Sequence, residues 1–230
     1  MSTTSKNVVI TGTSSGIGFE LTKQFSAAGH NVLALSRNMK PIEGLVSKRV
    51  HGFSFDITKQ KDIDKVAAYV KSEFKQVDIL IHNAGLLVAK PLAMLTEADF
   101  ENVYKVNVFG VAMLTKALVS LMPKNSHVVT ISSIGGVQGS IKFPGLAAYS
   151  SSKGAVITLS ELLAEEYKEK EIAFNVMALG AVQTEMLTKA FPDFKANVQP
   201  NEMAAHIMHF ALTGQQFYNG KVIEVSNSTP

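Results

Sequence analysis

The chain has 230 residues, of which 46% are hydrophobic and 18% are charged, and its formal net charge is +3. The apolar content excludes intrinsic disorder, and the small charge without a run of like residues gives no sign of a nucleic-acid surface. The absence of cysteine excludes disulfide bonds and thiolate chemistry. We expect a single domain over residues 1–230, located in the cytoplasm, that binds neither nucleic acid nor a membrane.

Seven short apolar runs bounded by Gly, Asn or Asp are typical of buried strands. In chain order they are 8–10, 32–35, 51–55, 79–81, 128–131, 174–178 and 222–225. Segments with helical apolar spacing lie between them, as at Ile17, Leu21 and Phe25. Strands that alternate with helices favour parallel pairing through right-handed crossovers. The sequence therefore predicts an α/β fold with one doubly wound parallel sheet of about seven strands flanked by helices.

The longest apolar tract, 106–122, is interrupted by Asn107 and Lys116. It predicts a buried helix rather than a membrane span, because a span needs about 20 predominantly apolar residues. The segment before the first predicted strand is polar and lacks the apolar stretch of a signal peptide.

The first predicted strand runs directly into a glycine-rich turn, TGTSSGIG at residues 11–18, which opens a helix. Glycines in this spacing permit a tight turn, close approach of the backbone to a diphosphate, and close packing of the helix on the sheet. The free N–H groups and positive dipole of the helix N-terminus favour an anion. Because the turn follows the first strand, we interpret it as a dinucleotide site rather than a merely structural turn.

The second predicted strand ends at Ser36 and Arg37, where the adenosine ribose of a bound dinucleotide is expected. An acidic residue at this place would bind the ribose 2′-hydroxyl, but none occurs between Glu20 and Glu43. Arg37 is one of only two arginines in the chain and can pair with a 2′-phosphate. The alternative is a solvated surface arginine, and we expect NADP(H) as the cofactor.

Tyr149 and Lys153 are four residues apart at the start of a predicted helix, so their side chains share one face. The ammonium favours the phenolate, so Lys153 is expected to lower the pKa of Tyr149 toward neutrality and make it a usable general acid. Ser132 and Ser133 end the fifth strand at the same carboxyl edge of the sheet as the glycine turn. A hydroxyl there can donate a hydrogen bond to a substrate carbonyl.

Taken together, these segments resemble the short-chain dehydrogenase/reductase family over nearly the whole chain. TGTSSGIG is similar to the family's TGxxxGxG turn, HNAG at residues 82–85 to its NNAG strand end, and Tyr149 to Lys153 to its YxxxK motif. Asn107 and Ser133 resemble the catalytic asparagine and serine. The resemblance implies a Rossmann-type domain that transfers a hydride between a nicotinamide cofactor and a carbonyl or secondary alcohol.

The resemblance also implies roles for the matched residues. Tyr149 would transfer the proton, Lys153 would lower its pKa and bind the nicotinamide ribose, and Ser133, preferred to Ser132, would orient the carbonyl. Asn107 would hold a water that continues the proton relay. The expected cofactor contacts are Gly12, Ser14, Ser15, Gly16, Ile17, Gly18, Arg37, Asp56, Ile57, Asn83, Ala84, Gly85, Tyr149, Lys153, Gly180, Val182 and Thr184.

The chain departs from the family pattern at four places. Ser133 precedes Tyr149 by more residues than is usual, so the loop at 134–144 is longer. Leu179 replaces the proline of the family's PGxVxT loop, and His82 replaces the first asparagine of NNAG. Only residues 38–48 separate the second and third strands, which is too short for a full helix and leaves the adenine side more open.

Residues 185–200 lie where family members place a mobile substrate lid. Met186, Leu187, Phe191 and Phe194 give this segment an apolar side, although a helix packed on the core would need the same residues. An apolar or acyl-type carbonyl substrate is therefore expected, since small-molecule pockets are mostly lined by apolar side chains.

Glu202, His206 and His209 share a helical face, but we predict no metal site, because such residues are ordinary on an exposed helix. The leading function is an NADP(H)-dependent carbonyl reductase, with 3-oxoacyl thioesters among its substrates. The alternatives are an alcohol, steroid or sugar dehydrogenase in the oxidising direction, or a non-catalytic NADP-sensing module. The family also implies a homodimer or homotetramer, formed through helices at 107–121 and 150–167.

Overall fold

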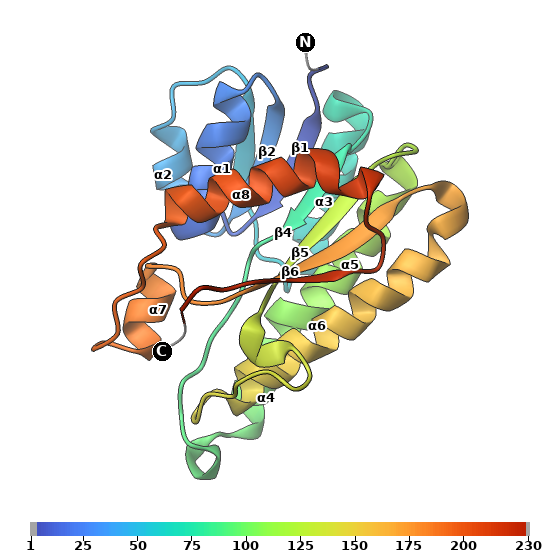
Figure 1. Ribbon diagram of the computed structural model, residues 1–230. Coiled ribbons are helices and arrows are strands. Elements are labelled where there is room, and N and C mark those ends of the chain that lie inside the picture. Colours follow the sequence, from blue (N-terminus) through green and yellow to red (C-terminus); the bar gives the residue numbers. More distant parts are fainter. Residues whose placement is uncertain (1–3, 229–230) are drawn as a thin grey trace.

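The computed structural model of the protein describes residues 4–228, and within them seven strands form one sheet (Figure 1). The strand order is β3-β2-β1-β4-β5-β6-β7, and every neighbouring pair is parallel. The strands are β1 (Asn7–Thr11), β2 (Asn31–Ser36), β3 (Val50–Ser54), β4 (Ile79–His82), β5 (His127–Ser133), β6 (Ala173–Leu179) and β7 (Val222–Val225). The predicted Rossmann-type, doubly wound sheet is thereby confirmed.

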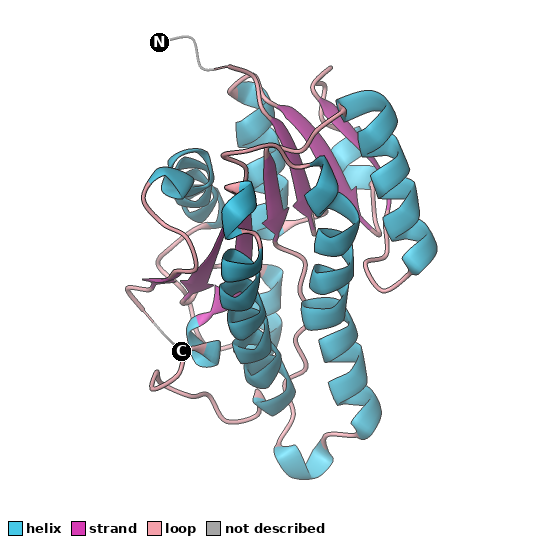
Figure 2. Cartoon of the chain, turned by 90° about the vertical axis from the view of Figure 1, so that its right-hand side faces the viewer, coloured by secondary structure: helices cyan, strands magenta, loops and turns pink. Residues whose placement is uncertain are grey.

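Helices cover both faces of the sheet because successive strand residues point to opposite sides. In β1, Val8 and Ile10 enter one core and Val9 enters the other, and all three are fully buried. The first core is covered by α1 (Gly16–Ala27), α2 (Lys40–Glu43) and α8 (Pro200–Thr213). The second is covered by α3 (Gln60–Tyr69), α5 (Gly110–Leu118) and α6 (Ala147–Glu166) (Figure 2).

One long helix runs from Glu97 to Leu121 and contains most of the predicted helix 106–122. It consists of α4 (Glu97–Tyr104), the π-helical turn η3 (Lys105–Phe109), α5 and the 3-10 turn η4 (Val119–Leu121). By length and composition alone this helix could cross a membrane, but 44% of its most apolar stretch is buried inside the protein. Leu114 and Leu118 are fully buried in the same core as α3, as expected for a core helix.

The connection between β2 and β3 contains only the four-residue helix α2, in agreement with the short segment 38–48. The remaining short elements are η1 (Val70–Phe74), η2 (Leu92–Met94), η5 (Ile134–Gly136), η6 (Lys168–Lys170), η7 (Gly214–Gln216) and α7 (Glu185–Ala190). Because the strands are parallel, their carboxyl ends meet at one edge of the sheet, and the polar strand ends gather there. α7 begins just beyond the end of β6, in the predicted lid region.

Candidate active site

The glycine turn between β1 and α1 requires glycine for two reasons. Gly12 and Gly16 have φ angles of +73° and +56°, which other residues adopt only with strain. A Cβ on Gly12 would lie 2.8 Å from the Cα of Ala84, and a Cβ on Gly18 would overlap the Gly12 carbonyl. The turn therefore packs directly against the segment that follows β4.

The N-terminus of α1 has groups available for an anion. Ser15 is its N-cap residue, and the described residues provide neither a side-chain cap nor an acidic group in the first turn. Within residues 4–228 the buried Thr13 Oγ1 also has no hydrogen-bond partner. Uncapped N–H groups and the positive helix dipole suit a diphosphate, so this turn, with Ser14 and Ile17, fits a dinucleotide.

Asn83 joins the end of β4 to the glycine turn. Its Nδ2 donates hydrogen bonds to the carbonyls of Thr11 (3.0 Å) and Gly12 (3.1 Å). The backbone N–H groups of Asn83 and Ala84 both donate to Thr11 Oγ1. Asn83 was expected to contact a ribose; its amide nitrogen holds the turn instead, which leaves Oδ1 for a ligand.

His82, which replaces an asparagine of the family motif, is buried between β4 and α5. Its Nε2 lies 2.8 Å from Thr115 Oγ1, so the ring ties the strand to the long helix. Burial lowers the pKa of His82 to about 3, so the imidazole is neutral at physiological pH.

On the adenosine side, Arg37 is exposed at the end of β2 and Asp56 follows β3. Partial burial acts to raise the pKa of Asp56, but hydrogen bonds from Thr58 and the charge of Arg37 hold it below its ordinary value. The Ile57 side chain is buried, and a Cβ on Gly110 would lie 2.6 Å from its Cγ1. The Ile57 side chain therefore packs against the long helix, and only the backbone of Ile57 can contact a cofactor.

The candidate catalytic residues come from three elements that meet beyond the sheet edge. Ser133 ends β5, Tyr149 and Lys153 lie at the start of α6, and Asn107 lies in η3. A Cβ on Gly85 would lie 3.7 Å from both Asn107 Oδ1 and Lys153 Nζ. The structure thus brings the expected catalytic residues beside the segment expected to contact the cofactor.

The two serines at the end of β5 have different surroundings. Ser132 is 3% exposed, and its Oγ donates a 2.9 Å hydrogen bond to the Lys153 carbonyl, which anchors α6 on the strand. Ser133 is partly exposed, and its Oγ accepts a 3.3 Å hydrogen bond from the Gly135 N–H. The Ser133 hydroxyl also lies near the Tyr149 phenol and acts to lower the pKa of Tyr149. This arrangement favours Ser133 as the serine that faces a substrate.

The pKa of Tyr149 moves in the direction opposite to the one expected from the sequence. Removal of the phenol from water raises this pKa to about 12, and the Ser133 hydroxyl opposes that effect only in part. Lys153 is 4% exposed, and its ammonium donates a 2.7 Å hydrogen bond to the Ile131 carbonyl. It lies 5.7 Å from the Tyr149 ring centroid, and burial lowers its own pKa to about 8. Tyr149 is therefore protonated at neutral pH.

Asn107 uses its whole side chain to hold the site together. Its Nδ2 donates to the Leu86 carbonyl and to Ser152 Oγ, both at 2.9 Å, and its Oδ1 accepts from the Leu86 N–H at 2.8 Å. Sequence reasoning missed Leu86 and Ser152, which are ordinary residues until the fold brings them together. Asn107 lies in the π-helical turn of the long helix, and such turns are frequent at functional sites.

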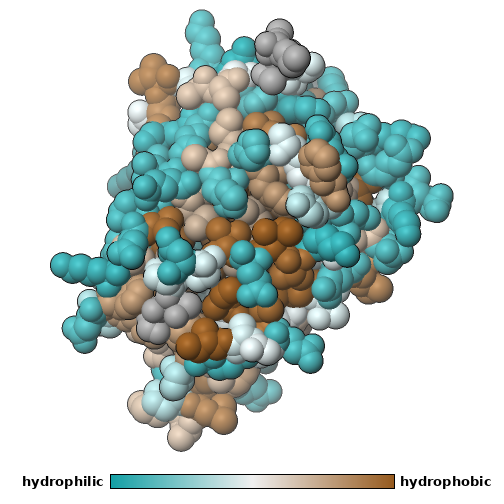
Figure 3. Space-filling view, in the orientation of Figure 1, coloured by the Kyte–Doolittle hydropathy of each residue, from teal (hydrophilic) through white to brown (hydrophobic). Residues whose placement is uncertain are grey.

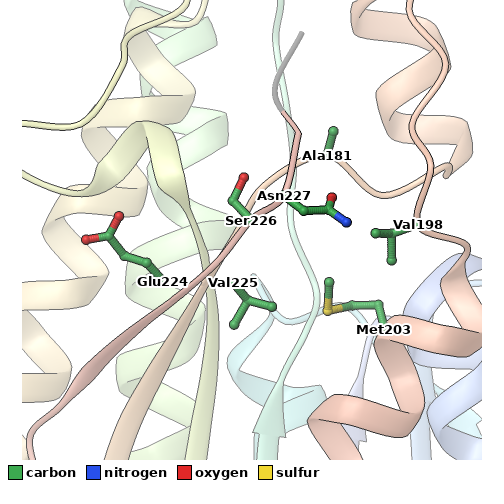
Figure 4. Close-up of a pocket in the computed structure, with 7 residues that line it drawn as sticks. All are labelled: Ala181, Val198, Met203, Glu224, Val225, Ser226 and Asn227. Carbon is green, nitrogen blue, oxygen red and sulfur yellow. The ribbon is translucent and has the colours of Figure 1, made fainter.

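The loop after β6, expected to contact the nicotinamide, is held by the end of the chain. The Gly180 N–H donates to the Val225 carbonyl at 2.9 Å, and the Ala181 N–H donates to the Ser228 carbonyl at 3.3 Å. A Cβ on Gly180 would overlap Ser226 Oγ, and Figure 4 shows Asn227 between Ser226 and Ala181. Sequence reasoning missed this contribution of residues 226–228, for which no motif gives a signal.

Two further expected residues lie in the same loop. Val182 is buried in the core that α8 covers, and Thr184 Oγ1 accepts from the Leu187 N–H and caps α7. Leu179, in place of the family's proline, pairs with Ser133 and Val225 in the sheet, so strand pairing fixes its backbone.

The residues considered for a metal site have a different role. Within the described part of the chain, no three His, Cys, Asp or Glu side chains are grouped to hold an ion. Glu202 Oε2 accepts a 2.8 Å hydrogen bond from the Gln199 N–H and so caps α8.

Comparison with known proteins agrees with this architecture. The family model described as short chain dehydrogenase matches residues 6–195. The chain is 30% identical to a 3-oxoacyl-[acyl-carrier-protein] reductase of Thermotoga maritima, over 96% of each protein. Among solved structures it is similar to a 3-ketoacyl-(acyl-carrier-protein) reductase from Brucella melitensis complexed with NADH, with a TM-score of 0.87, 25% identity and coverage of 96% of each chain. A putative short chain dehydrogenase from Shigella flexneri complexed with NADP has the same TM-score and identity and covers 95% of this chain and 96% of its own. The chain belongs to the short-chain dehydrogenase family of oxidoreductases, which use nicotinamide cofactors.

Proposed function

We propose that the protein is a cytoplasmic, NADP(H)-dependent reductase of apolar or acyl-type ketones, with 3-oxoacyl thioesters among its substrates. The observation that carries this proposal is that Ser133 and Lys153 both lie near Tyr149, and that Lys153 also lies beside Gly85, close to the glycine turn. A binding module has no need of such a set at one place. The names of the related reductases support the acyl-type substrate, and the absence of cysteine fits a cytoplasmic location.

In this mechanism the cofactor, when bound, supplies the hydride. The N-terminus of α1 binds its diphosphate, and Lys153 binds the nicotinamide ribose. Ser133 donates a hydrogen bond to the substrate carbonyl oxygen, and Tyr149 donates a proton to the same oxygen. Tyr149 holds its proton at neutral pH, as a proton donor must, although burial of the phenol raises its pKa to about 12.

We propose that Asn107 holds a water that continues the proton relay past Lys153, as the family resemblance implies. Both its amide groups are already hydrogen-bonded to Leu86 and Ser152. A water that relays protons to Lys153 must therefore be held by the backbone of Asn107 rather than by its amide.

The preference for NADP(H) rests on Arg37. Arg37 is exposed at the end of β2, and no acidic residue occurs in the sequence between Glu20 and Glu43. A guanidinium binds a 2′-phosphate through charge-assisted hydrogen bonds. The related structures contain NADH in one case and NADP in the other, so the choice is a property of each chain's own residues.

A turnover screen of carbonyl compounds and alcohols with both nicotinamide cofactors tests the proposal. We expect NADPH-dependent reduction of an apolar 3-oxo compound. Faster oxidation of alcohols, steroids or sugars would favour the dehydrogenase alternative. Tight NADPH binding without turnover of any compound would favour the sensing module.

We also propose that the enzyme is a homodimer or homotetramer. Phe109 and Met113 on the long helix and Leu162 on α6 are large apolar side chains with exposed fractions of 55%, 41% and 62%. Figure 3 shows further hydrophobic side chains gathered near the centre of one face, around the open edge strand β7. Exposed apolar surface of this kind marks subunit contacts. Light scattering on the purified protein should give at least twice the chain mass of 24.8 kDa, and a monomer would contradict the proposal.

A further inference from the structure

Two loops on the substrate side of the site meet through a pair of aromatic rings. Phe143 belongs to the long loop between β5 and α6, and Phe191 follows α7. Their ring centroids are 6.0 Å apart with an interplanar angle of 70°, which is the edge-to-face geometry that aromatic pairs favour. Both rings are partly exposed, so they can separate without disrupting the core.

The Phe143 ring and the serine expected to bind the substrate both lie near Gly135. A Cβ on Gly135 would lie 3.7 Å from both Phe143 Cδ2 and Ser133 Oγ. At the other end of the same region, a Cβ on Gly85 would lie 4.0 Å from Met186 Cε and 3.7 Å from Lys153 Nζ. The segment 185–196 therefore extends from the Lys153 side of the site to the Ser133 side.

Hydrogen bonds fix this segment at its base, whereas packing holds its outer part. At the base, the Gln183 N–H donates to the Val198 carbonyl at 2.9 Å, and Gln183 Oε1 accepts from the Ala196 N–H at 2.8 Å. No hydrogen bond among residues 4–228 joins 185–196 to the loop 134–146. Contact between the outer part and the rest of the site therefore depends on packing, of which the Phe143–Phe191 pair is the defined element.

We propose that Phe143 and Phe191 form an aromatic latch that holds segment 185–196 over Ser133 and selects substrates with an apolar group next to the carbonyl. The proposed substrate selectivity rests on the proposed reductase function, whereas the contact between the two rings does not depend on that function. An apolar group packs against the two phenyl rings, while a hydroxylated or charged group there loses water without gaining a hydrogen-bond partner. Phe143 and Phe191 are thus specificity-determining residues for the proposed reaction.

Limited proteolysis tests the latch independently of activity. Trypsin can cleave after Lys189 and Lys195, which are exposed within the latched segment, once the segment opens. Loss of an edge-to-face aromatic contact should shift the equilibrium between the closed and open positions of segment 185–196 by roughly 2- to 10-fold. Phe143→Ala and Phe191→Ala should therefore each speed cleavage by about that factor. The double variant should be cleaved no faster than the more sensitive single variant, because the two residues act through one contact.

The control is Phe217→Ala, which removes a phenyl ring that is 76% exposed outside this region and should leave cleavage unchanged. Cleavage at the wild-type rate in Phe143→Ala would overturn the latch, as would fully additive effects in the double variant.

The selectivity is tested by comparing an alkyl 3-oxo ester with a small polyhydroxylated ketone. Phe143→Ala and Phe191→Ala should lower kcat/KM for the alkyl substrate by roughly 2- to 10-fold, with the polar ketone and NADPH affinity unaffected. Equal losses on both ketones would overturn the selectivity. If the wild-type protein reduces no ketone, the proposed function and the selectivity fail together, while the cleavage experiment still decides the latch.

Discussion

The two halves of the candidate site are held by different kinds of interaction. On the cofactor side, backbone conformation at Gly12 and Gly16 and hydrogen bonds from Asn83 fix the glycine turn against β4. On the substrate side, the defining contact is between two side chains, Phe143 and Phe191, on two loops that share no hydrogen bond among the described residues.

This difference predicts different responses to substitution. A side chain added in the glycine turn meets backbone atoms or needs a strained φ angle, so cofactor binding should be lost as a whole. A change in the substrate half meets side chains and loops that can adjust, so its effects should be graded and reversible by a compensating change.

Gly16→Val should give the largest effect on binding. Valine at a φ of +56° is strained and faces Thr184, whose Cγ2 would be 3.4 Å from its Cβ, so the turn cannot keep the shape that binds a diphosphate. NADPH affinity, measured by fluorescence titration, should fall more than about 100-fold. Gly29→Val is the matched control, because Gly29 has a φ of +89° and its Cβ would meet nothing within 4 Å among the described residues. Binding by Gly16→Val at the level of this control would show that the turn is only structural.

Arg37→Ala should weaken NADPH binding by about 10- to 100-fold, because a charge-assisted contact to the 2′-phosphate is lost. NADH lacks that phosphate, so its affinity should hardly change. Arg49→Ala is the control, because it removes the other arginine of the chain. Arg49 lies just before β3 and donates a hydrogen bond to Asn31 Oδ1, so its loss should alter neither the NADPH nor the NADH affinity. Equal affinities of the wild-type protein for NADPH and NADH would refute the role of Arg37.

Gly180→Ala should raise the NADPH dissociation constant by about 10-fold, because the added Cβ would overlap Ser226 and displace the loop that follows β6. The second substitution Ser226→Gly should restore most of the affinity in the same titration. Lack of restoration would place the effect elsewhere than in the contact between this loop and the end of the chain.

The smallest effect concerns the pH dependence of stability. Burial lowers the pKa of His82 to about 3 and of His127 to about 4, below the ordinary 6.5. The unfolded chain therefore takes up protons near pH 6.5 while the folded protein does not, so stability is lost as the pH falls below about 6.5. Each histidine should contribute a loss of up to about 1 kcal/mol between pH 7 and pH 6 in urea unfolding. His127→Gln should show a smaller loss over this interval, and an unchanged loss would contradict the assignment.

The parts of the protein that the sequence predicts well are those in which one local segment decides the outcome. All seven strands follow from short apolar runs, and the short helix α2 follows from the few residues between β2 and β3. The glycine turn follows in the same way, because positive φ angles and tight packing require glycine within one short segment.

The parts that sequence reasoning missed depend on where distant residues meet. The pKa of Tyr149 rises rather than falls, because burial of the phenol outweighs the opposing effect of the Ser133 hydroxyl. The spacing of Tyr149 and Lys153 contains no information about either effect. The contact between Ala181 and Ser228 joins residues from two strand ends, and no motif predicts it.

The measurement that tests the central claim most directly is turnover and NADPH affinity of Tyr149→Phe beside the wild-type protein. The substitution removes one hydroxyl and leaves the apolar ring, so the fold and the cofactor site should persist. Because general acid catalysis typically contributes about 10²- to 10⁴-fold, reduction of the best ketone should fall by at least about 100-fold while NADPH affinity stays within about 2-fold. Wild-type turnover by Tyr149→Phe on that ketone would contradict the assignment of Tyr149 as the proton donor.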